Sequence, residues 1–518
     1  MDKIARPVRV SSSPGRRVWD LVVRSAEGRA ALSSSGLRFP CDTRGFSVIR
    51  FEFASELPVS AEEAYAWHTR PGALERLVPP WEDVRVLERR GGFEDSVVVL
   101  EVPVGPGHGR WVARHREVVP GRQFVDEQVE GPFARWTHTH AFEPAGPDRC
   151  RYVDRIVYKL PFGPAGALGE RYIRRRLERS FRYRHATVRD DLAAQRRAAA
   201  IAGLTIAITG ASGFIGRTLI PFLTTAGHRV RRIVRRNPAS DDILWNPSAR
   251  QLDPAALEGI DAVIHLAGEP IAGRWTRSRR RQVLESRRDS TALLTETLAG
   301  LRRPPRVLVS ASGIGIYGHR SDKLVTEETH LRTGRDTMFV EQVGQAWEAA
   351  TAGAERAGIR AVQVRLGMVL SPAGGALARM LPAFRAGVGG RLGHGRQYMS
   401  WIGVDDVVGA IYHVLVTDRL SGPVNLTAPE PVTNAEFTAT LAEVLGRPAV
   451  LPVPSVVLRV LFGDMARELL LASCHVLPSR LQESGYVFRH AHLRSALLHV
   501  LGREAPGSRA GAARGSNP

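Results

Sequence analysis

Residues 206–216 read Ile-Ala-Ile-Thr-Gly-Ala-Ser-Gly-Phe-Ile-Gly, and this stretch decides the fold. A short apolar strand runs directly into three glycines, and an amphipathic run follows them. This context predicts a strand, a tight turn and a helix whose N-terminus holds a phosphate group. Gly210 permits the sharp turn, Gly213 lets the backbone approach a pyrophosphate, and Gly216 lets the helix lie close to the strand. The other residues expected to line this cradle are Ser212, Phe214 and Ile215.

The chain around this motif alternates between strands and helices. Strands are expected at 204–209, 229–234, 261–266, 306–310 and 361–366, and helices at 214–226, 277–299 and 337–357. This alternation is typical of α/β proteins and predicts a Rossmann-type, doubly wound parallel sheet over residues 203–370. Residues 371–502 are rich in glycine and short elements, and we expect a small substrate-side lobe there. Asp405 and Asp406 precede an apolar run in that lobe and are expected to cap a helix.

Residues 46–192 follow a different pattern. Strands are expected at 48–53, 97–102, 111–119, 135–142 and 151–158, and helices at 61–68 and 169–192. This order predicts an α+β domain in which a long helix closes an antiparallel sheet. The polar segments 1–45 and 503–518 are expected to be disordered, and residues 193–202 to form a linker.

One predicted strand of this domain combines aromatic residues with histidines. Trp136, His138, His140 and Phe142 alternate along it, so they share one face of the sheet. That face either lines a ligand cavity or lies against solvent. The His-x-His pair also occurs in metal sites, but no further ligand stands near it in the sequence, and we predict no metal.

Composition argues against several classes of partner. The formal net charge is +20 over 518 residues, which often accompanies nucleic-acid binding. Here the cations are nearly all arginines scattered through every segment, without a basic stripe interleaved with aromatic residues, so we expect no nucleic-acid partner. No run of about 18 apolar residues occurs, so no membrane span is expected. The three cysteines lie far apart and predict no disulfide framework, which favours the cytoplasm.

The ends of the next two strands indicate which dinucleotide is bound. A protein that binds NAD carries an acidic residue after the second strand, where it holds the ribose 2′-hydroxyl. This chain has Arg235 and Arg236 there, and a guanidinium suits a 2′-phosphate. We therefore expect NADP(H), with NAD(H) as the alternative. After the following strand, the small residues among Leu266, Ala267, Gly268 and Glu269 let the adenosine side pack against the backbone.

Four motifs in this half resemble the extended short-chain dehydrogenase/reductases, and among these an epimerase-family group. They are Thr209–Gly216, Leu266–Ile271, Ser310–Ser312 with Tyr317-Gly318, and Gly393–Tyr398 with Trp401-Ile402. The resemblance spans about residues 203–500 and includes the C-terminal segment Pro452–Phe488. It implies an NADP(H)-binding fold and a small-molecule substrate. It also implies that Ser310, Arg365 and Gly367 lie beside the cofactor.

The N-terminal half resembles the helix-grip fold of START-like (SRPBCC) and polyketide-cyclase-like proteins. The similar residues are Gly131–His140 and Tyr158–Gly163. The resemblance implies a cavity between a curved sheet and a long helix, and with it a hydrophobic ligand.

The proton-transfer pair of the short-chain reductases is missing. Those enzymes use a tyrosine followed four residues later by a lysine, because the lysine lowers the pKa of the phenol. No Tyr-x-x-x-Lys occurs in this chain, and Met338–Gly344 stands where the family pattern places the pair. Three candidates remain. Ser312 is a candidate orienting hydroxyl, Tyr317 is also explained by packing, and Glu341 is either a substitute acid/base or part of a solvated helix face.

The Gly-rich segment after residue 390 is a candidate substrate site. Its polar and aromatic residues are Arg396, Gln397, Tyr398 and Trp401, which suit an anionic group, although a structural loop explains them equally well. The sequence as a whole predicts an NADP(H)-dependent oxidoreductase or epimerase-like enzyme with a ligand-binding N-terminal domain. The alternatives are a dinucleotide-binding regulator without turnover and a carrier of apolar ligands.

Overall fold

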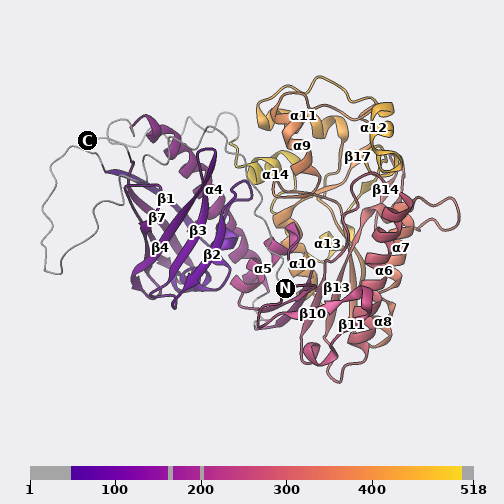
Figure 1. Cartoon of the computed structure of the whole chain (residues 1–518), viewed down its shortest axis with the longest axis horizontal. Helices are drawn as coiled ribbons and strands as arrows, with labels where there is room; N and C mark the ends of the chain where they lie inside the picture. Colours follow the sequence, from indigo (N-terminus) through magenta and orange to yellow (C-terminus); the bar gives the residue numbers. More distant parts are fainter. Residues whose placement is uncertain (1–47, 162–166, 199–202, 505–518) are drawn as a thin grey trace, which may run out of the picture. The chain divides into compact units, whose positions relative to one another are not determined.

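The computed structural model describes residues 48–161, 167–198 and 203–504 (Figure 1). These residues all belong to one unit, Val48–Pro518. The segments predicted to be disordered, 1–45 and 503–518, lie outside the described residues except for positions 503 and 504. None of the helices within the described ranges is long and apolar enough to cross a lipid bilayer.

An eight-stranded sheet forms the centre of the second half of the chain, in the order β11-β10-β9-β8-β12-β13-β15-β19. The strands are β8 (Thr205–Thr209), β9 (Arg229–Val234), β10 (Ile243–Asn246), β11 (Gln251–Leu252), β12 (Ala262–His265), β13 (Val307–Gly313), β15 (Arg360–Leu366) and β19 (Gly422–Leu426). All neighbours run parallel except β10 and β11. The order reverses between β8 and β12, and dinucleotides bind at the carboxyl end of such a switch point. The Rossmann-type sheet is therefore confirmed.

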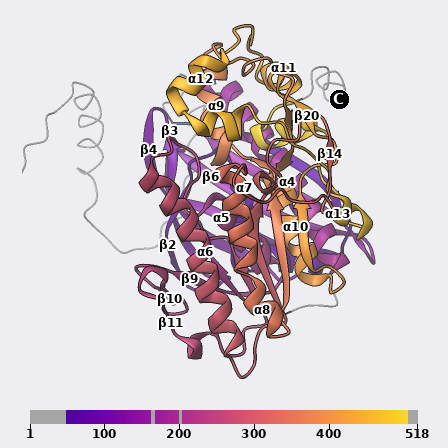
Figure 2. The same ribbon diagram turned by 90° about the vertical axis from the view of Figure 1, so that its right-hand side faces the viewer.

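Helices cover both faces of this sheet. They are α5 (Phe214–Thr225), α6 (Arg277–Ala299), α7 (Phe339–Ala349), α8 (Ala352–Arg356) and α10 (Val404–Val416). Ile206 and Ile208 pack with residues of α5 and α10, whereas Ala207 between them packs with residues of α6 and α8. Figure 2 looks onto the face covered by α6 and α7. The single helix predicted at 337–357 is two helices, α7 and α8, because the chain turns between them.

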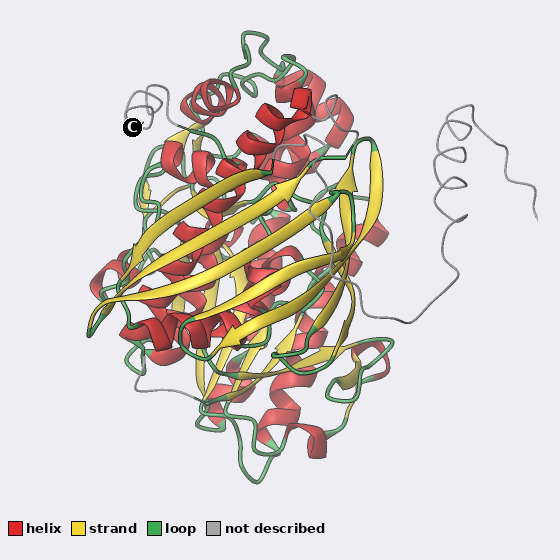
Figure 3. Cartoon of the chain, turned by 90° about the vertical axis from the view of Figure 1, so that its left-hand side faces the viewer, coloured by secondary structure: helices red, strands yellow, loops and turns green. Residues whose placement is uncertain are grey.

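A seven-stranded antiparallel sheet and a long helix form the first half of the described chain (Figure 3). The strand order is β1-β7-β6-β5-β4-β3-β2. The strands are β1 (Ile49–Leu57), β2 (Arg85–Arg90), β3 (Val97–Val104), β4 (Gly107–Val119), β5 (Gln123–Glu130), β6 (Arg135–Gly146) and β7 (Arg149–Lys159), and the helices are α2 (Ala61–Thr69), α3 (Ala73–Leu77) and α4 (Ala167–Arg197). Phe181 of α4 packs on Phe51 of β1, so the long helix closes the sheet as predicted. Residues 193–197 of the predicted linker are helical, and 199–202 lie outside the described residues.

The remaining elements form a smaller lobe with its own apolar core, which includes Leu377, Trp401, Phe437 and Leu497. Its helices are α9 (Gly375–Arg385), α11 (Asn434–Leu445), α12 (Ser455–Phe462) and α14 (Leu493–Leu501), with a π-helical turn at Ala466–Leu470. Helix α13 (Ser479–Glu483) instead packs on the central sheet, where Leu481 joins the core that includes Val424 and Leu426 of β19. The short strands are β14 (Leu324–Val325), β16 (Met368–Leu370), β17 (Tyr398–Met399), β18 (Trp401–Gly403), β20 (Val432–Thr433) and β21 (His475–Val476). Short 3₁₀ helices occur at Pro247–Ala249, Pro254–Leu257 and Ile314–Tyr317.

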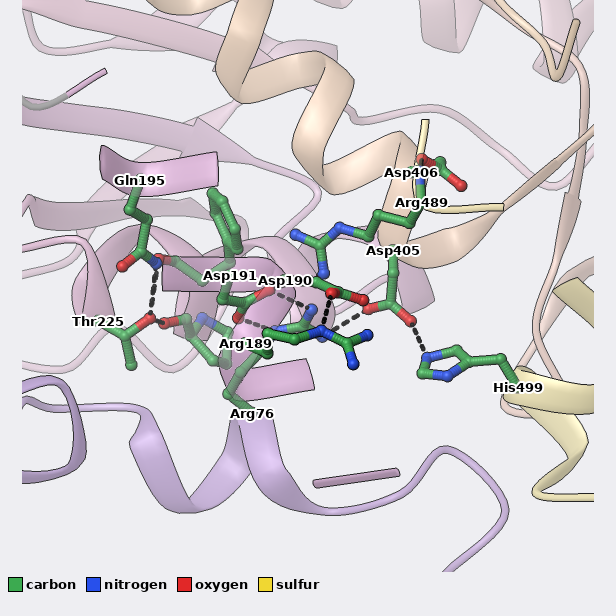
Figure 4. Close-up of polar contacts among 12 residues, drawn as sticks. Arg76, Arg189, Asp190, Asp191, Gln195, Thr225, Asp405, Asp406, Arg489 and His499 are labelled. Atoms are coloured by element: carbon green, nitrogen blue, oxygen red, sulfur yellow. Dashed lines mark hydrogen bonds and ion pairs between the residues drawn. The ribbon is translucent and has the colours of Figure 1, made fainter. Parts of the chain in front are cut away.

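A buried network of ion pairs joins the N-terminal domain to the rest of the chain (Figure 4). Arg76 Nε of α3 lies 2.7 Å from Asp191 Oδ2 of α4, and Arg76 NH1 lies 2.7 Å from Asp405 Oδ1 of α10. Arg489 NH1 is 2.8 Å from Asp191 Oδ1, and His499 Nε2 is 3.1 Å from Asp405 Oδ2. Burial alone would raise the pKa of Asp405, but the charge of Arg76 and the hydrogen bond from His499 hold it well below its ordinary value.

These contacts correct the expected role of the two aspartates. Asp405 and Asp406 lie in the first turn of α10, but neither side chain caps that helix. Asp406 instead accepts hydrogen bonds from the backbone N–H groups of Arg489 and His490, at 2.7 and 3.1 Å. Both carboxylates therefore bind segments that are distant in the sequence.

Candidate functional site

The glycines after β8 have the close contacts that a phosphate cradle requires. Gly210 has a φ of +70°, and a Cβ added there would lie 2.7 Å from the carbonyl carbon of Leu266. A Cβ on Gly216 would lie 2.5 Å from the carbonyl oxygen of Gly210. Real Cβ atoms do not approach backbone so closely, so both positions accept only glycine. The predicted roles of a sharp turn and a close helix–strand contact follow from these distances.

The N-terminus of α5 is open to a ligand. Its N-cap is Gly213, no side chain among the described residues caps it, and its first turn carries no acidic residue. The first three N–H groups of a helix, here those of Phe214, Ile215 and Gly216, have no partner inside the helix. Ser212 and Gly213 are exposed beside them. The positive end of the helix dipole and these N–H groups form an anion-binding site.

The end of β12 is fixed next to this cradle by a residue that the sequence analysis missed. The Thr209 hydroxyl oxygen accepts hydrogen bonds from the N–H groups of Leu266 and Ala267, at 3.1 and 3.2 Å. It also lies 2.8 Å from Nδ1 of His265, and burial lowers the pKa of that imidazole to about 4. In the neutral imidazole, this nitrogen accepts the hydrogen bond that the Thr209 hydroxyl donates. Leu266 and Ala267 are half-buried and Gly268 is exposed, as a packing surface for an adenosine requires.

The two arginines after β9 are exposed. The Arg235 side chain is 71% exposed, and its NH1 lies 3.9 Å from Glu269 Oε1. Glu269 Oε2 also lies 3.3 Å from NH1 of Arg279, so this carboxylate is shared between two guanidiniums. Arg235 and Arg236 therefore remain accessible to an added phosphate.

Two of the residues proposed for catalysis, Ser312 and Tyr317, lie in one hydrogen-bond network, in which Glu348 and Arg365 connect them. Ser312 Oγ donates to Glu348 Oε1 at 2.7 Å, and Tyr317 OH donates to Asn425 Oδ1 at 2.8 Å. Arg365 donates to Tyr317 OH at 2.8 Å and binds Glu348 through two further bonds of 2.8 and 2.7 Å. Arg365 is thus part of this buried network, and its expected place beside the cofactor stays a prediction.

This network leaves no free acid or base. Tyr317 is fully buried, and burial raises its pKa to about 12. The single O–H of Ser312 is donated in a hydrogen bond to Glu348, so it is not free to bind a substrate oxygen. Ser310 is buried on the same strand, and Gly367 is required for packing, since its Cβ would lie 2.8 Å from the carbonyl oxygen of Ser400. The packing interpretation of Tyr317 fits these contacts.

Glu341 has a structural role that neither expectation described. Its side chain is fully buried, so the solvated helix face is wrong. Its carboxylate accepts two hydrogen bonds from Arg332, at 3.0 and 2.7 Å, and one from the N–H of Met338 at 2.8 Å. It closes the first turn of α7.

The proposed substrate loop is mostly tied to its own lobe. Gln397 is buried and donates to the carbonyls of Leu392 and Leu470. Trp401 is fully buried with its Nε1 donating to the carbonyl of Glu430, and Tyr398 stacks on a histidine ring. Of the four residues only Arg396 is exposed. The structural interpretation of this loop therefore fits the contacts better than direct substrate binding.

Two cavities that the sequence analysis missed are rich in arginine. One, of about 510 Å³, is lined by Arg274, Arg459 and Arg467 together with Trp275, Phe462 and one carboxylate, that of Asp464. The other, of about 370 Å³, borders Phe339 at the start of α7 and is lined by four arginines and three carboxylates: Arg280, Arg332, Arg335, Arg467, Asp336, Asp464 and Glu468. The start of α7 is where the family pattern places its catalytic pair. The sequence signal was weak because arginine is common throughout the chain.

The face of β6 that carries the histidines points inward. Trp136, His138, His140 and Phe142 are all buried, so the solvated-face alternative is wrong. His138 packs edge-on against Phe181 of α4 at 5.3 Å between ring centroids. The polar atoms of the two histidines reach aspartates on the neighbouring strands, as described below.

Profiles of three families match the chain. The NAD dependent epimerase/dehydratase family matches residues 206–426, the domain of unknown function DUF1731 matches 453–500, and the polyketide cyclase / dehydrase and lipid transport family matches 57–181. Epimerase family protein Mb2239 of Mycobacterium bovis is 44% identical over 305 residues, covering 58% of this chain and 99% of the relative. Human epimerase family protein SDR39U1 is 35% identical over 301 residues, covering 58% of this chain and all of the relative.

Two solved structures are similar to the chain. A protein of Corynebacterium glutamicum described as a nucleoside-diphosphate sugar epimerase has a TM-score of 0.70 and 31% identity, and the match covers 87% of this chain and 90% of that one. Human SDR39U1 solved with NADPH has a TM-score of 0.53 and 33% identity, and the match covers 57% of this chain and 99% of that one. The chain therefore belongs to the NAD-dependent epimerase/dehydratase family and carries a polyketide-cyclase-like domain ahead of the family's Rossmann fold.

Proposed function

We propose that the protein binds NADPH at the N-terminus of α5 and acts as an oxidoreductase on a small-molecule substrate. The observation that carries the proposal is the uncapped helix behind Gly210, Gly213 and Gly216. Such a helix terminus is a site for a diphosphate, and its place at the β8/β12 switch point is where dinucleotides bind. The human relative, which was solved with NADPH, supports the same ligand here.

The preference for NADPH over NADH rests on Arg235 and Arg236. Both are exposed directly after β9, and the three residues that follow the strand, Arg235, Arg236 and Asn237, offer no carboxylate to a ribose 2′-hydroxyl. A charge-assisted hydrogen bond contributes roughly 1.5–3 kcal/mol, so losing one costs about 10- to 100-fold in affinity. Arg235→Asp should therefore weaken NADPH by that factor and leave NADH unchanged or tighter.

Calorimetric titration of NADPH and NADH into the full chain tests this preference. Arg302→Asp is the matched control, because Arg302 is 93% exposed and lies in the loop after α6. It makes the same change of charge without touching β9. Equal loss of NADPH affinity in both variants would mean that Arg235 acts only through the overall charge, and the 2′-phosphate assignment would be wrong.

The proposal of an anionic substrate rests on Arg335 in the smaller cavity beside α7. The other three arginines of that cavity are paired with carboxylates, whereas Arg335 has no ion pair within the described residues. A guanidinium without a partner binds carboxylate and phosphate groups in a bidentate manner. We propose this region as the substrate site, in place of the loop around Arg396.

Binding without turnover is the second candidate function, and the internal network favours it. Tyr317, Ser312 and Glu341 each have their hydrogen bonds satisfied by neighbouring protein groups. An enzyme acting through them would need to break that network. Incubation of NADPH-loaded protein with carboxylated and phosphorylated carbonyl compounds separates the two functions, because oxidation of NADPH establishes an enzyme and its absence across the set favours a regulator.

The N-terminal domain is proposed to bind a hydrophobic ligand at its aromatic end. Trp111, Phe133 and Trp136 pack together with centroid distances of 4.7–5.7 Å, and the buried hydroxyl of Tyr158 has no hydrogen-bond partner within the described residues. A ligand with one polar atom would satisfy it. Quenching of tryptophan fluorescence by an apolar probe, and its loss in Trp136→Leu, tests the idea and with it the carrier alternative. The widely spaced cysteines agree with the proposed cytoplasmic location.

A further inference from the structure

The interior of the N-terminal domain contains a cluster of histidines and aspartates. The cluster lies between strands β4–β7 and helices α2 and α4. Its members are His68, His115, Asp126, His138, His140, Asp154 and His185. Six of the seven side chains are at most 14% exposed, and Asp126 is 28% exposed. The nucleotide site described above does not use any of them.

Three of these residues have the spacing of a metal site. Asp126, His138 and His140 each offer one ligand atom, and these atoms all lie within 4.8 Å of one another. His140 Nε2 and Asp126 Oδ2 are 3.2 Å apart. Bonds of about 2.0–2.1 Å to a tetrahedral zinc ion place neighbouring ligand atoms about 3.3 Å apart. The distance between His140 Nε2 and Asp126 Oδ2 is already close to this value.

The groups around these three residues hold them in place. Asp154 Oδ1 lies 2.8 Å from Nε2 of His138 and 2.8 Å from Nδ1 of His140. His115 Nε2 lies 3.0 Å from the second oxygen of Asp126, and its Nδ1 lies 2.7 Å from the carbonyl of Phe93. Metal-binding histidines and carboxylates usually have such partners, which fix the orientation of each ligand.

His68 provides an independent observation. Its Nδ1 bonds the carbonyl of Ala64 in its own helix at 2.8 Å, so Nε2 carries a lone pair and is directed away from α2, towards the sheet. The side chain is buried at 6% exposure, and Nε2 has no hydrogen-bond partner within the described residues. Its ring centroid lies 6.1 Å from that of His140. An unsatisfied buried nitrogen is costly, and a metal or its bound water would satisfy it.

The charge of the cluster also fits a divalent cation. Asp126 and Asp154 bring two carboxylates into a largely buried site, and the ion pairs that reach them come from histidines. A divalent ion balances two carboxylates when the imidazoles are neutral. Nitrogen ligands with one carboxylate suit zinc, iron and cobalt, whereas calcium and magnesium prefer oxygen ligands alone.

We propose that Asp126, His138 and His140 bind a divalent first-row transition-metal ion inside the N-terminal domain, with Asp154 orienting both imidazoles. His68, whose ring centroid lies 6.1 Å from that of His140, is the group that we expect beside the remaining coordination position. This inference is independent of the proposed NADPH site, and it replaces the prediction of no metal that was made from the sequence.

Titration of chelator-treated full-length protein with Co²⁺ tests the proposal. We expect one equivalent to produce the visible d–d bands of a four- or five-coordinate ion, and Zn²⁺ to displace it. Asp126→Asn and His138→Gln should abolish the bands, and Asp154→Asn should weaken binding about 10- to 100-fold. His185→Gln is the matched control, because His185 is equally buried and bonds Asp154 at 2.8 Å but is not a ligand.

Two outcomes would overturn the proposal. If the folded, metal-free protein gives no Co²⁺ bands and no thermal shift with Zn²⁺, the cluster is a metal-free network of imidazolium–carboxylate pairs. If Asp126→Asn and His138→Gln bind Co²⁺ as tightly as the parent protein, the metal lies elsewhere on the chain. Circular dichroism of each variant, with Mg²⁺ as a non-binding ion, separates loss of metal from loss of fold.

Discussion

The N-cap position of α5 allows the nucleotide site to be removed without damaging the fold. Gly213 has φ −69° and ψ 162°, a conformation that aspartate adopts readily at a helix N-cap. A Cβ added there would lie 3.2 Å from the carbonyl oxygen of Gly210, which requires a shift of a few tenths of an ångström. Gly213→Asp therefore places a carboxylate where we expect the diphosphate, on a backbone that accepts it.

The expected magnitude follows from the N–H groups of the first turn. An aspartate at the N-cap accepts a hydrogen bond from the N–H group of the second or third helical residue, here Ile215 or Gly216. One charge-assisted bond lost to the diphosphate costs roughly 1.5–3 kcal/mol, or about 10- to 100-fold in affinity, and repulsion between the carboxylate and the diphosphate adds to this loss. The same substitution changes the stability of the helix by only a few tenths of a kcal/mol.

Calorimetric titration with NADPH and thermal denaturation measure the two effects separately. Gly213→Asn is the control, because its side chain has the same size and the same capping preference but no charge, so the difference in affinity between the two variants measures the repulsion between the carboxylate and the diphosphate. The reasoning would be refuted if the Gly213→Asp protein had the melting temperature of the parent protein and an NADPH affinity within about threefold of the parent's. The diphosphate would then lie elsewhere.

Three further predictions concern the rest of the chain. Arg76→Met leaves two buried carboxylates short of a partner and should destabilise the protein by about 3–5 kcal/mol in urea denaturation, whereas Arg90→Met, at an exposed pair, should leave the urea midpoint nearly unchanged. Burial lowers the pKa of His490 to about 3, so the folded protein keeps it neutral while the unfolded chain protonates near pH 6.5. The stability that it contributes should fall by up to about 1.4 kcal/mol per unit as the pH drops from about 6.5 towards 3, and urea denaturation at several pH values should show a flatter dependence in His490→Gln. Tyr317→Phe should leave the NADPH affinity and any turnover unchanged but lower the urea midpoint by an amount equivalent to about 1–3 kcal/mol, because the hydroxyl bonds only Asn425 and Arg365.

The sequence predicted the Rossmann half well because its signals are local. Residues 205–209 form a strand, three glycines follow, and the helix begins at Phe214, so one short segment contains the whole cradle. The expected helix 277–299 has the same bounds in the structure. The short strands β10, β11 and β19 were missed, because two to five residues carry too little periodicity to separate a strand from a loop.

Roles that depend on distant partners were not predictable. From the sequence, Glu341 was interpreted as a surface carboxylate or a catalytic one. The structure shows that Arg332 and the start of α7 enclose it. Trp401 looked like a substrate residue because aromatic residues also line binding sites, but it is fully buried in the lobe core. Asp126 stands on the strand next to the His-x-His pair, and only the antiparallel register, which pairs it with His138, brings the third proposed ligand to the two histidines.

Helix α5 decides whether the two halves of the chain act together. Its N-terminus forms the cradle, and its other end contacts the N-terminal domain. There, a Cβ on Gly72 would lie 2.9 Å from the Cα of Pro221, and Arg70 NH1 donates to the carbonyl of Thr225 at 2.7 Å. A cation at the C-terminal end of a helix also stabilises its dipole. The buried Arg76 and Asp405 fix the neighbouring helix α10 in the same way, because their charges are compensated only in this arrangement. Helix α5 forms the cradle at one end and contacts the N-terminal domain at the other, so the N-terminal domain cannot shift without moving the cradle. Two domains joined only by a linker would move independently.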